Sequence, residues 1–181
     1  LLNNNQIGAY FLQDSILIDA EYSSYIEPYG SYYTTSQGAK EGLIDSLGEV
    51  VLTFQYNDLS YLSDTMVWVK TDSSWQIQQI VDDRVIQYGI RSFEPMLLQN
   101  ERFFKVTTST GYGIVDQQGR YLVSPSFSDI RSVSDGLNHL FVCEKSVPEA
   151  GFYLWVGFDA YGKKVFSEAY REEVYEEFAC D

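Results

Sequence analysis

Few residues of this chain have the types that catalysis or metal binding requires. His139 is the only histidine, so a histidine-rich metal site is excluded, and a Ser-His-Asp triad would need this residue as its base. No Gly-x-Ser-x-Gly motif accompanies it. Because His139 stands beside Leu140 at the edge of an expected strand, we interpret it as a structural or surface residue.

Neighbouring carboxylates are the next candidates, since two positioned acids suffice for glycoside hydrolysis or help to bind calcium. The chain has 26 acidic residues, so such neighbours arise by chance, and turn positions explain several of the aspartates. We therefore predict no catalytic residue, no metal site and no enzyme activity. The pairs are Asp19 with Glu21, Asp82 with Asp83, Glu172 with Glu173, and Glu176 with Glu177.

Aromatic side chains offer a binding chemistry instead, because their rings stack on sugars and anchor peptides. Trp75 and Trp155 occupy one position of an internal repeat, which favours a structural role. Trp68 has no tryptophan counterpart, so Trp68, Tyr32 and Tyr33 are the candidate ligand-binding residues.

Cofactor and thiol motifs do not extend this set. Gly111-Tyr112-Gly113 begins like a dinucleotide-binding motif, but residue 116 is aspartate and no helical pattern follows, so we expect no cofactor. Cys143 and Cys180 lack the spacing of a zinc or redox motif. Cys143 lies in an apolar run, which favours free thiols over a disulfide.

The charge of the chain limits its partners. The formal net charge is −14, which repels nucleic acid and anionic lipid, and no apolar span of roughly 18 residues indicates membrane insertion by this segment. The chain starts at Leu1 without methionine. We expect a segment excised from a longer protein, with an extracytoplasmic or cell-surface location slightly favoured over the cytoplasm.

The elements that position these residues follow from an internal repeat. The segment from Gly42 to Gly48 reappears from Gly113 to Gly119 with its aspartate and both glycines in place. Weaker copies predict a single domain over residues 1–181 with five units. Their approximate bounds are 8–41, 42–75, 76–112, 113–155 and 156–181.

The columns of this repeat predict local structure. Asp at the first turn position and Gly at the fourth close a hairpin, and Asp14 and Asp82 replace the glycine in two copies. Two adjacent columns are apolar, which indicates burial on both faces or a bulge. One large side chain per unit should pack on its counterpart in the next unit. That column holds Tyr22, Tyr56, Ile90, Phe127 and Tyr170.

Each unit is thus expected to contain three antiparallel strands: one ending at the turn aspartate, a second such as Glu49 to Phe54, and a third such as Thr65 to Lys70. The fold class is an all-β tandem array, open and elongated, with a closed five-bladed propeller as the alternative. Val174, Tyr175 and Phe178 favour a short helical cap at the C-terminus.

These residues resemble the WG-repeat family of bacterial β-repeat proteins, whose unit has an aromatic-Gly pair, two residues, Asp, two residues and Gly. Tyr112-Gly113 keeps the pair, whereas Trp75-Gln76 and Trp155-Val156 lose the glycine. The resemblance covers residues 8 to about 170. It implies a repeat module that serves as an interaction surface, and it supplies no active site.

Three functions follow in order of preference. The first is a non-catalytic module for protein interaction or scaffolding, with another protein as its partner. The second is a glycan-binding module of a cell-surface protein, and the third is a carboxylate-based hydrolase. An exposed row of aromatic rings would favour the glycan, and convergent carboxylates in a cleft would favour the enzyme.

Overall fold

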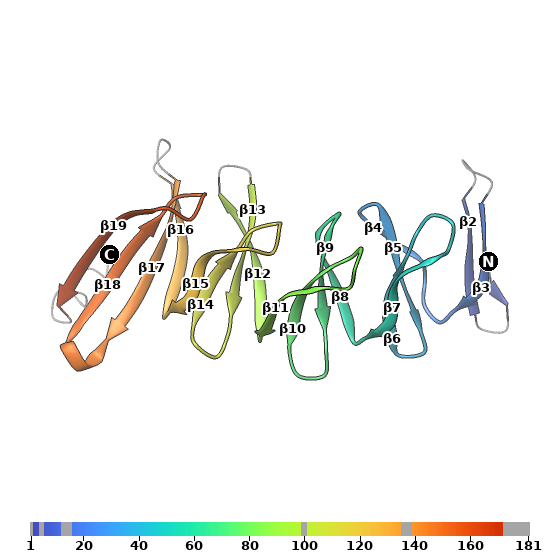
Figure 1. Cartoon of the computed structure of the whole chain (residues 1–181), viewed down its shortest axis with the longest axis horizontal. Coiled ribbons are helices and arrows are strands. Elements are labelled where there is room, and N and C mark those ends of the chain that lie inside the picture. The colour runs from blue at the N-terminus through green and yellow to red at the C-terminus, as the bar shows by residue number, and fades with distance from the viewer. Residues whose placement is uncertain (1, 4–5, 12–15, 99–100, 135–138, 172–181) are drawn as a thin grey trace. The chain divides into compact units, whose positions relative to one another are not determined.

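The computed structural model describes residues 2–3, 6–11, 16–98, 101–134 and 139–171. Within these ranges the chain forms β-strands and one 3₁₀ turn, Pro148–Ala150 (Figure 1). No sheet of these residues closes into a barrel. The prediction of an all-β fold made of open antiparallel repeats is therefore confirmed. The expected C-terminal cap and the turn residue Asp14 lie outside the described residues.

The chain divides into two compact units, residues 1–89 and 90–181, each of which is described by itself. The single domain of five units stays a prediction. The first unit contains three sheets, ordered β1-β2-β3, β4-β5-β6-β7 and β11-β10-β9-β8. Their strands are β1 (Leu2–Asn3), β2 (Gln6–Phe11), β3 (Ile16–Tyr22), β4 (Glu27–Tyr29), β5 (Tyr32–Gln37), β6 (Lys40–Ile44), β7 (Val50–Tyr56), β8 (Asp58–Ser63), β9 (Met66–Lys70), β10 (Trp75–Gln79) and β11 (Val85–Ile90).

The second unit contains two sheets, ordered β12-β13-β14-β15 and β16-β17-β18-β19, and each strand follows its neighbour along the chain. These sheets are meanders, which form quickly from local pairings. Their strands are β12 (Ser92–Leu98), β13 (Glu101–Thr107), β14 (Tyr112–Val115), β15 (Tyr121–Phe127), β16 (Asp129–Ser134), β17 (His139–Val147), β18 (Phe152–Phe158) and β19 (Lys164–Arg171).

The complete sheets have four strands, one more than the three expected from the repeat. The segment after Tyr56, expected to be a polar connection, forms β8 and pairs with β9 through Leu59↔Val69. The strand β9 in turn pairs with β10 of the following repeat, as in Ile77↔Trp68. Each such sheet therefore combines the last two strands of one repeat with the first two of the next.

The glycine that opens a repeat lies opposite a bulge in the returning strand. In one sheet Glu41 pairs with Tyr56 and Leu43 with Leu52, so that Gly42 faces three residues of β7. A Cβ atom added to Gly42 would lie 2.6 Å from the carbonyl oxygen of Leu52. The bulge therefore requires glycine at this position, because any side chain would collide with backbone.

The same close approach recurs at other copies and disappears where the glycine is lost. An added Cβ would lie 2.4 Å from the carbonyl oxygen of Ile18 at Gly8, and 2.7 Å from that of Val123 at Gly113. In the last copy valine replaces the glycine, and Val156 pairs in regular register with Ser167. The sequence of this column thus sets the register of the hairpin.

Neighbouring sheets are joined by the large side chains that the repeat predicted, although their partners differ from the expected ones. Tyr22 packs with Ile44 in one core cluster, and its ring lies 5.7 Å from that of Phe54. The equivalent Phe127 packs against Phe158 at 6.0 Å. The contacts therefore reach the opening hairpin of the next repeat, which forms the last two strands of the neighbouring sheet, and not the counterpart Tyr56 that the repeat suggested.

A backbone hydrogen bond accompanies this packing at successive junctions. The residue after each large side chain donates its N–H group to a carbonyl oxygen in the second strand of the next sheet. These bonds pair backbone groups of the connecting segments with the next sheet, as buried backbone groups require. They are Ser23 to Ser36, Asn57 to Lys70, Arg91 to Thr107 and Ser128 to Glu144, at 2.7 to 2.8 Å.

Candidate functional site

In three repeats the hairpin between the first two strands is held by an aspartate. Asp45 Oδ1 accepts hydrogen bonds from the N–H groups of Leu47 and Glu49 at 2.8 and 2.9 Å. Asp116 and Asp159 form the same two bonds in their own turns, all at 2.9 Å. The predicted turn geometry is confirmed, and it fixes the backbone of the residue two positions after the aspartate.

The middle copy reaches a similar turn with one additional residue. The N–H group of Gln79 donates to the carbonyl oxygen of Arg84, which closes a longer loop than in the other copies. Asp83 adopts a φ of 55° and is the only non-glycine residue with positive φ among the described residues. The expectation that Asp82 takes the left-handed conformation is therefore wrong by one position, because the loop length differs.

These turns expose apolar side chains at one repeated position. Leu47 is 61% exposed, Val81 is 76% exposed and Tyr161 is 82% exposed, and we call these three the tip residues. Each of their hairpins carries a further exposed valine early in its returning strand. These valines are Val50, Val85 and Val165.

The hairpin β14–β15 presents a polar group at the same position. Gln118 stands there, and the ion pair between Asp116 and Arg120, at 2.7 Å, lies beside it. The apolar character of the tip therefore varies from copy to copy while the turn geometry is kept. Sequence reasoning missed the tip residues, although their alignment two positions after the turn aspartate was visible.

The aromatic residues predicted to bind a ligand are mostly internal. Trp68 is fully buried in β9 between Val67 and Val69, which are also fully buried, so its ring offers no surface for stacking. Tyr32 and Tyr33 are adjacent on β5 and half-buried, and they pack against two different core clusters. The structure does not bring these three rings together on one surface.

Aromatic residues at the repeat opening lie beside cations. Lys70 Nζ lies 5.5 Å from the ring centre of Trp75, and Arg131 lies 5.8 Å from that of Trp155. Trp155 also donates its indole N–H to Glu144 at 3.2 Å. These contacts support the structural role predicted for the two tryptophans, since each ring faces the charged group of a neighbouring side chain.

The remaining candidates are dispersed. His139 begins β17 opposite Ser134 and is partly buried. Cys143 is a free, fully buried thiol, and burial raises its pKa to about 12. Asp19 and Glu21 are exposed on β3. The pairs at 172–173 and 176–177, like Cys180, lie outside the described residues.

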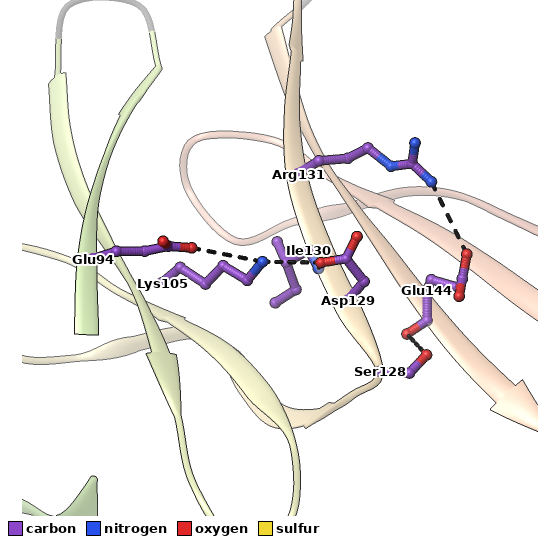
Figure 2. A network of polar contacts seen from close by, with 7 residues as sticks. All are labelled: Glu94, Lys105, Ser128, Asp129, Ile130, Arg131 and Glu144. Atoms are coloured by element: carbon purple, nitrogen blue, oxygen red, sulfur yellow. Dashed lines mark hydrogen bonds and ion pairs between the residues drawn. The ribbon is translucent and has the colours of Figure 1, made fainter. Parts of the chain in front are cut away.

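A polar network links the two sheets of the second unit (Figure 2). Lys105 is 14% exposed, and its Nζ lies 2.9 Å from Asp129 Oδ1 and 3.7 Å from Glu94 Oε1. The hydrogen bond from Lys105, together with the N–H group of Ile130, holds the pKa of Asp129 below its usual value. The same ammonium lies 4.5 Å from the ring centre of Tyr112.

A second polar group completes this network on β17. Glu144 lies 4.0 Å from Arg131, and its carbonyl oxygen accepts a hydrogen bond from the Ser128 hydroxyl at 3.0 Å. Each charged group drawn in Figure 2 has an opposite charge or a donor within reach. The arrangement stabilises the contact between the sheets and directs no reactive group at a cleft.

Each unit has a cleft lined by described residues. One, in the first unit, has a volume of about 380 Å³ and is lined by three glutamines among other polar residues. The other, in the second unit, has a volume of about 330 Å³ and is lined by residues that include Arg102 and Asp116. Over the described ranges no group of three His, Cys, Asp or Glu residues is placed to hold a metal ion.

Long apolar helices are not found in the described part of the chain, so none of its helices could cross a membrane. Comparison with curated proteins gave no match. Comparison with family models matched the WG containing repeat at residues 42–75 and 112–140. These segments carry two of the turn aspartates and two of the glycines that face a bulge. Two segments of this tandem β-repeat chain are therefore WG-containing repeats.

Proposed function

We propose that this chain is a non-catalytic interaction module that binds another protein through its tip residues. The observation that carries the proposal is the repeated exposure of Leu47, Val81 and Tyr161 at one turn position. A single exposed apolar side chain is ordinary on a protein surface. Leu47 and Val81 lie in the first unit and Tyr161 in the second. Repeat proteins commonly carry recognition residues at one position of successive repeats.

The turn supports this role by fixing the tip before any partner arrives. The aspartate that binds the backbone N–H of Leu47 also binds that of Glu49, and Asp159 does the same for Tyr161 and Lys163. A tip held in this way loses little conformational entropy on binding, so more of the apolar contact contributes to affinity. Gln118, in the same setting, makes its hairpin a weaker contributor.

Affinity capture with matched variants tests the proposal. The wild-type chain, the triple variant L47S/V81S/Y161S and the control Q118S are each used for capture from extracts, and any partner found is purified for calorimetry. We expect one defined partner whose affinity falls at least tenfold in the triple variant and stays unchanged in Q118S. Circular dichroism checks that all three chains keep the same fold.

The contrary result is equally clear. If the partner binds the triple variant as tightly as the wild type, the tip residues are not the interaction surface. If purified chain captures nothing above the background of the triple variant, the proposal of a protein partner fails.

A further inference from the structure

The cleft of the first unit lies between two neighbouring sheets, one containing β7 and the other β10. Tyr56 and Gln55 line it from β7, while Gln76 and Gln78 line it from β10. Its volume of about 380 Å³ lies within the range of sites that bind small molecules. The remaining lining residues are Lys40, Thr71, Asp72, Asp83 and Val85.

At this cleft the middle repeat departs from the pattern of two other copies. Where two other copies have Gly42 with Ile44 and Gly113 with Val115, this copy has Gln76 with Gln78. Ile44 and Val115 are fully buried. Gln78 therefore places an amide where these two copies have a buried apolar side chain, and Gln76 replaces a glycine. Such departures from a local pattern are typical of functional sites.

The amides are joined by a neutral chain of hydrogen bonds. Gln55 Nε2 donates to the hydroxyl of Tyr56 at 2.9 Å, and that hydroxyl donates to Gln78 Oε1 at 2.9 Å. Gln78 is only 3% exposed. Because its oxygen is used by Tyr56, its amide nitrogen is left to supply donors to the cleft. The oxygen of Gln55 and the amide of Gln76 add acceptors and donors around it.

The charged residues at the rim are largely neutralised by one another. Lys40 Nζ lies 3.8 Å from Asp72 Oδ1 and donates to Asn57 Oδ1 at 2.6 Å. The hydrogen bond from Asn57 and the charge of Lys40 lower the pKa of Asp72, which is therefore ionised at neutral pH. An anionic ligand would meet Asp72 and Asp83 in a chain of net charge −14.

We propose that this cleft binds a neutral saccharide unit through the side-chain amides of Gln55, Gln76 and Gln78. Each sugar hydroxyl is both donor and acceptor, which matches alternating amide nitrogens and oxygens. Tyr56 and Val85 give the cleft apolar surface beside its amides, and a sugar offers both C–H groups and hydroxyls to such a lining. An extended peptide fits less well, since its recognition needs side-chain pockets or a strand edge. The site is separate from the tip residues and does not depend on them.

A glycan array followed by NMR titration tests this site on the full chain. The array identifies neutral oligosaccharides that bind, and the titration follows side-chain amide signals of the three glutamines. We expect millimolar to micromolar binding with shifts confined to these amides. Loss of one hydrogen-bonding amide should weaken binding about tenfold, as in Q76A, whereas the control Q118A should bind like the wild type.

A second variant separates binding from folding. Q78L restores the apolar side chain that other copies have at this position, so it should fold normally and lose binding at least tenfold. The proposal is overturned if no neutral glycan binds, or if Q76A and Q78L bind as the wild type does. It is also overturned if neutral glycine-serine peptides shift the same amides and sugars do not. Neither result depends on the L47S/V81S/Y161S variant.

Discussion

Lys105 Nζ lies 2.9 Å from Asp129 Oδ1 and joins β13 of one sheet to β16 of the next. The lysine is 14% exposed at its side chain, whereas the aspartate is 48% exposed. The nearby Glu94, at 3.7 Å, is 66% exposed. Lys105 is thus the more buried partner of the ion pair. Its charge is stabilised mainly by the shorter contact, which is with Asp129.

Replacing this aspartate should destabilise the second unit. D129N removes the charge that faces Lys105 but keeps an oxygen for the N–H group of Ile130, so we expect a loss of about 1 kcal/mol at pH 7. The control E94Q should cost less than about 0.5 kcal/mol because that carboxylate is exposed. Urea unfolding measures both, and equal costs would contradict the assignment.

The same contact should give stability a defined pH dependence. The pKa of Asp129 is lowered in the folded chain, so its contribution is fully present above the unfolded pKa, about 4. It is lost as the pH falls through the lower, folded pKa. The difference in unfolding free energy between wild type and D129N should therefore shrink below about pH 4. A difference that stays constant down to pH 2 would argue against this origin.

Replacing a glycine that faces a bulge should destabilise the chain, because an added side chain would collide with the backbone. G113A places a methyl group 2.7 Å from the carbonyl oxygen of Val123, so we expect a cost of at least about 2 kcal/mol. G38A is the comparison: its φ is 63° with open space around the added atom, so only backbone strain of about 1 kcal/mol applies. Chemical denaturation of both variants gives the comparison, and a milder effect of G113A would refute the steric explanation.

Replacing different turn aspartates by alanine should lower the free energy of unfolding by different amounts. D45A removes the acceptor for two backbone N–H groups in an exposed turn, and we expect a cost of about 1 kcal/mol. D116A also leaves Arg120 without its ion pair at 2.7 Å and should cost more. Hydrogen exchange should accelerate at Leu47 in D45A and at Gln118 in D116A. Unchanged exchange at these amides would show that the turns close without the carboxylate.

Cys143 should be inert in the folded chain. Burial raises the pKa of its thiol to about 12, so almost no thiolate exists at pH 8 and no reagent reaches it. In a C180S background, labelling by a disulfide reagent should follow global unfolding in urea. Rapid labelling without denaturant would contradict the buried position.

The sequence predicted the hairpin turns because their determinants are local. Asp45 and Gly48 act within one turn, and a short segment carries the whole signal. The pairing of β8 with β9 was not predicted, although Asp58 to Tyr61 alternates polar and apolar residues and Leu59 and Tyr61 pack against the core. The alternation covers only four residues, and a run this short does not separate a strand from a connection.

The candidate sites were harder to predict for a related reason. Trp68 was selected because it departs from its column, but the departure filled the core with a larger side chain. Gln76 and Gln78 also depart from their columns, and they line the cleft. Whether such a side chain is buried or lines a cleft depends on the strand that lies next to it, and the sequence does not show which strand that is.

Each four-stranded sheet takes two strands from each of two successive repeats, so the boundaries of the sheets differ from the boundaries of the sequence repeats. Recombination between equivalent points of two copies would regenerate whole four-stranded layers wherever the crossover fell. A nick between β5 and β6, by contrast, would leave two incomplete halves held only by their hydrogen-bonded edges. The number of repeats can therefore change by unequal recombination without leaving an incomplete sheet.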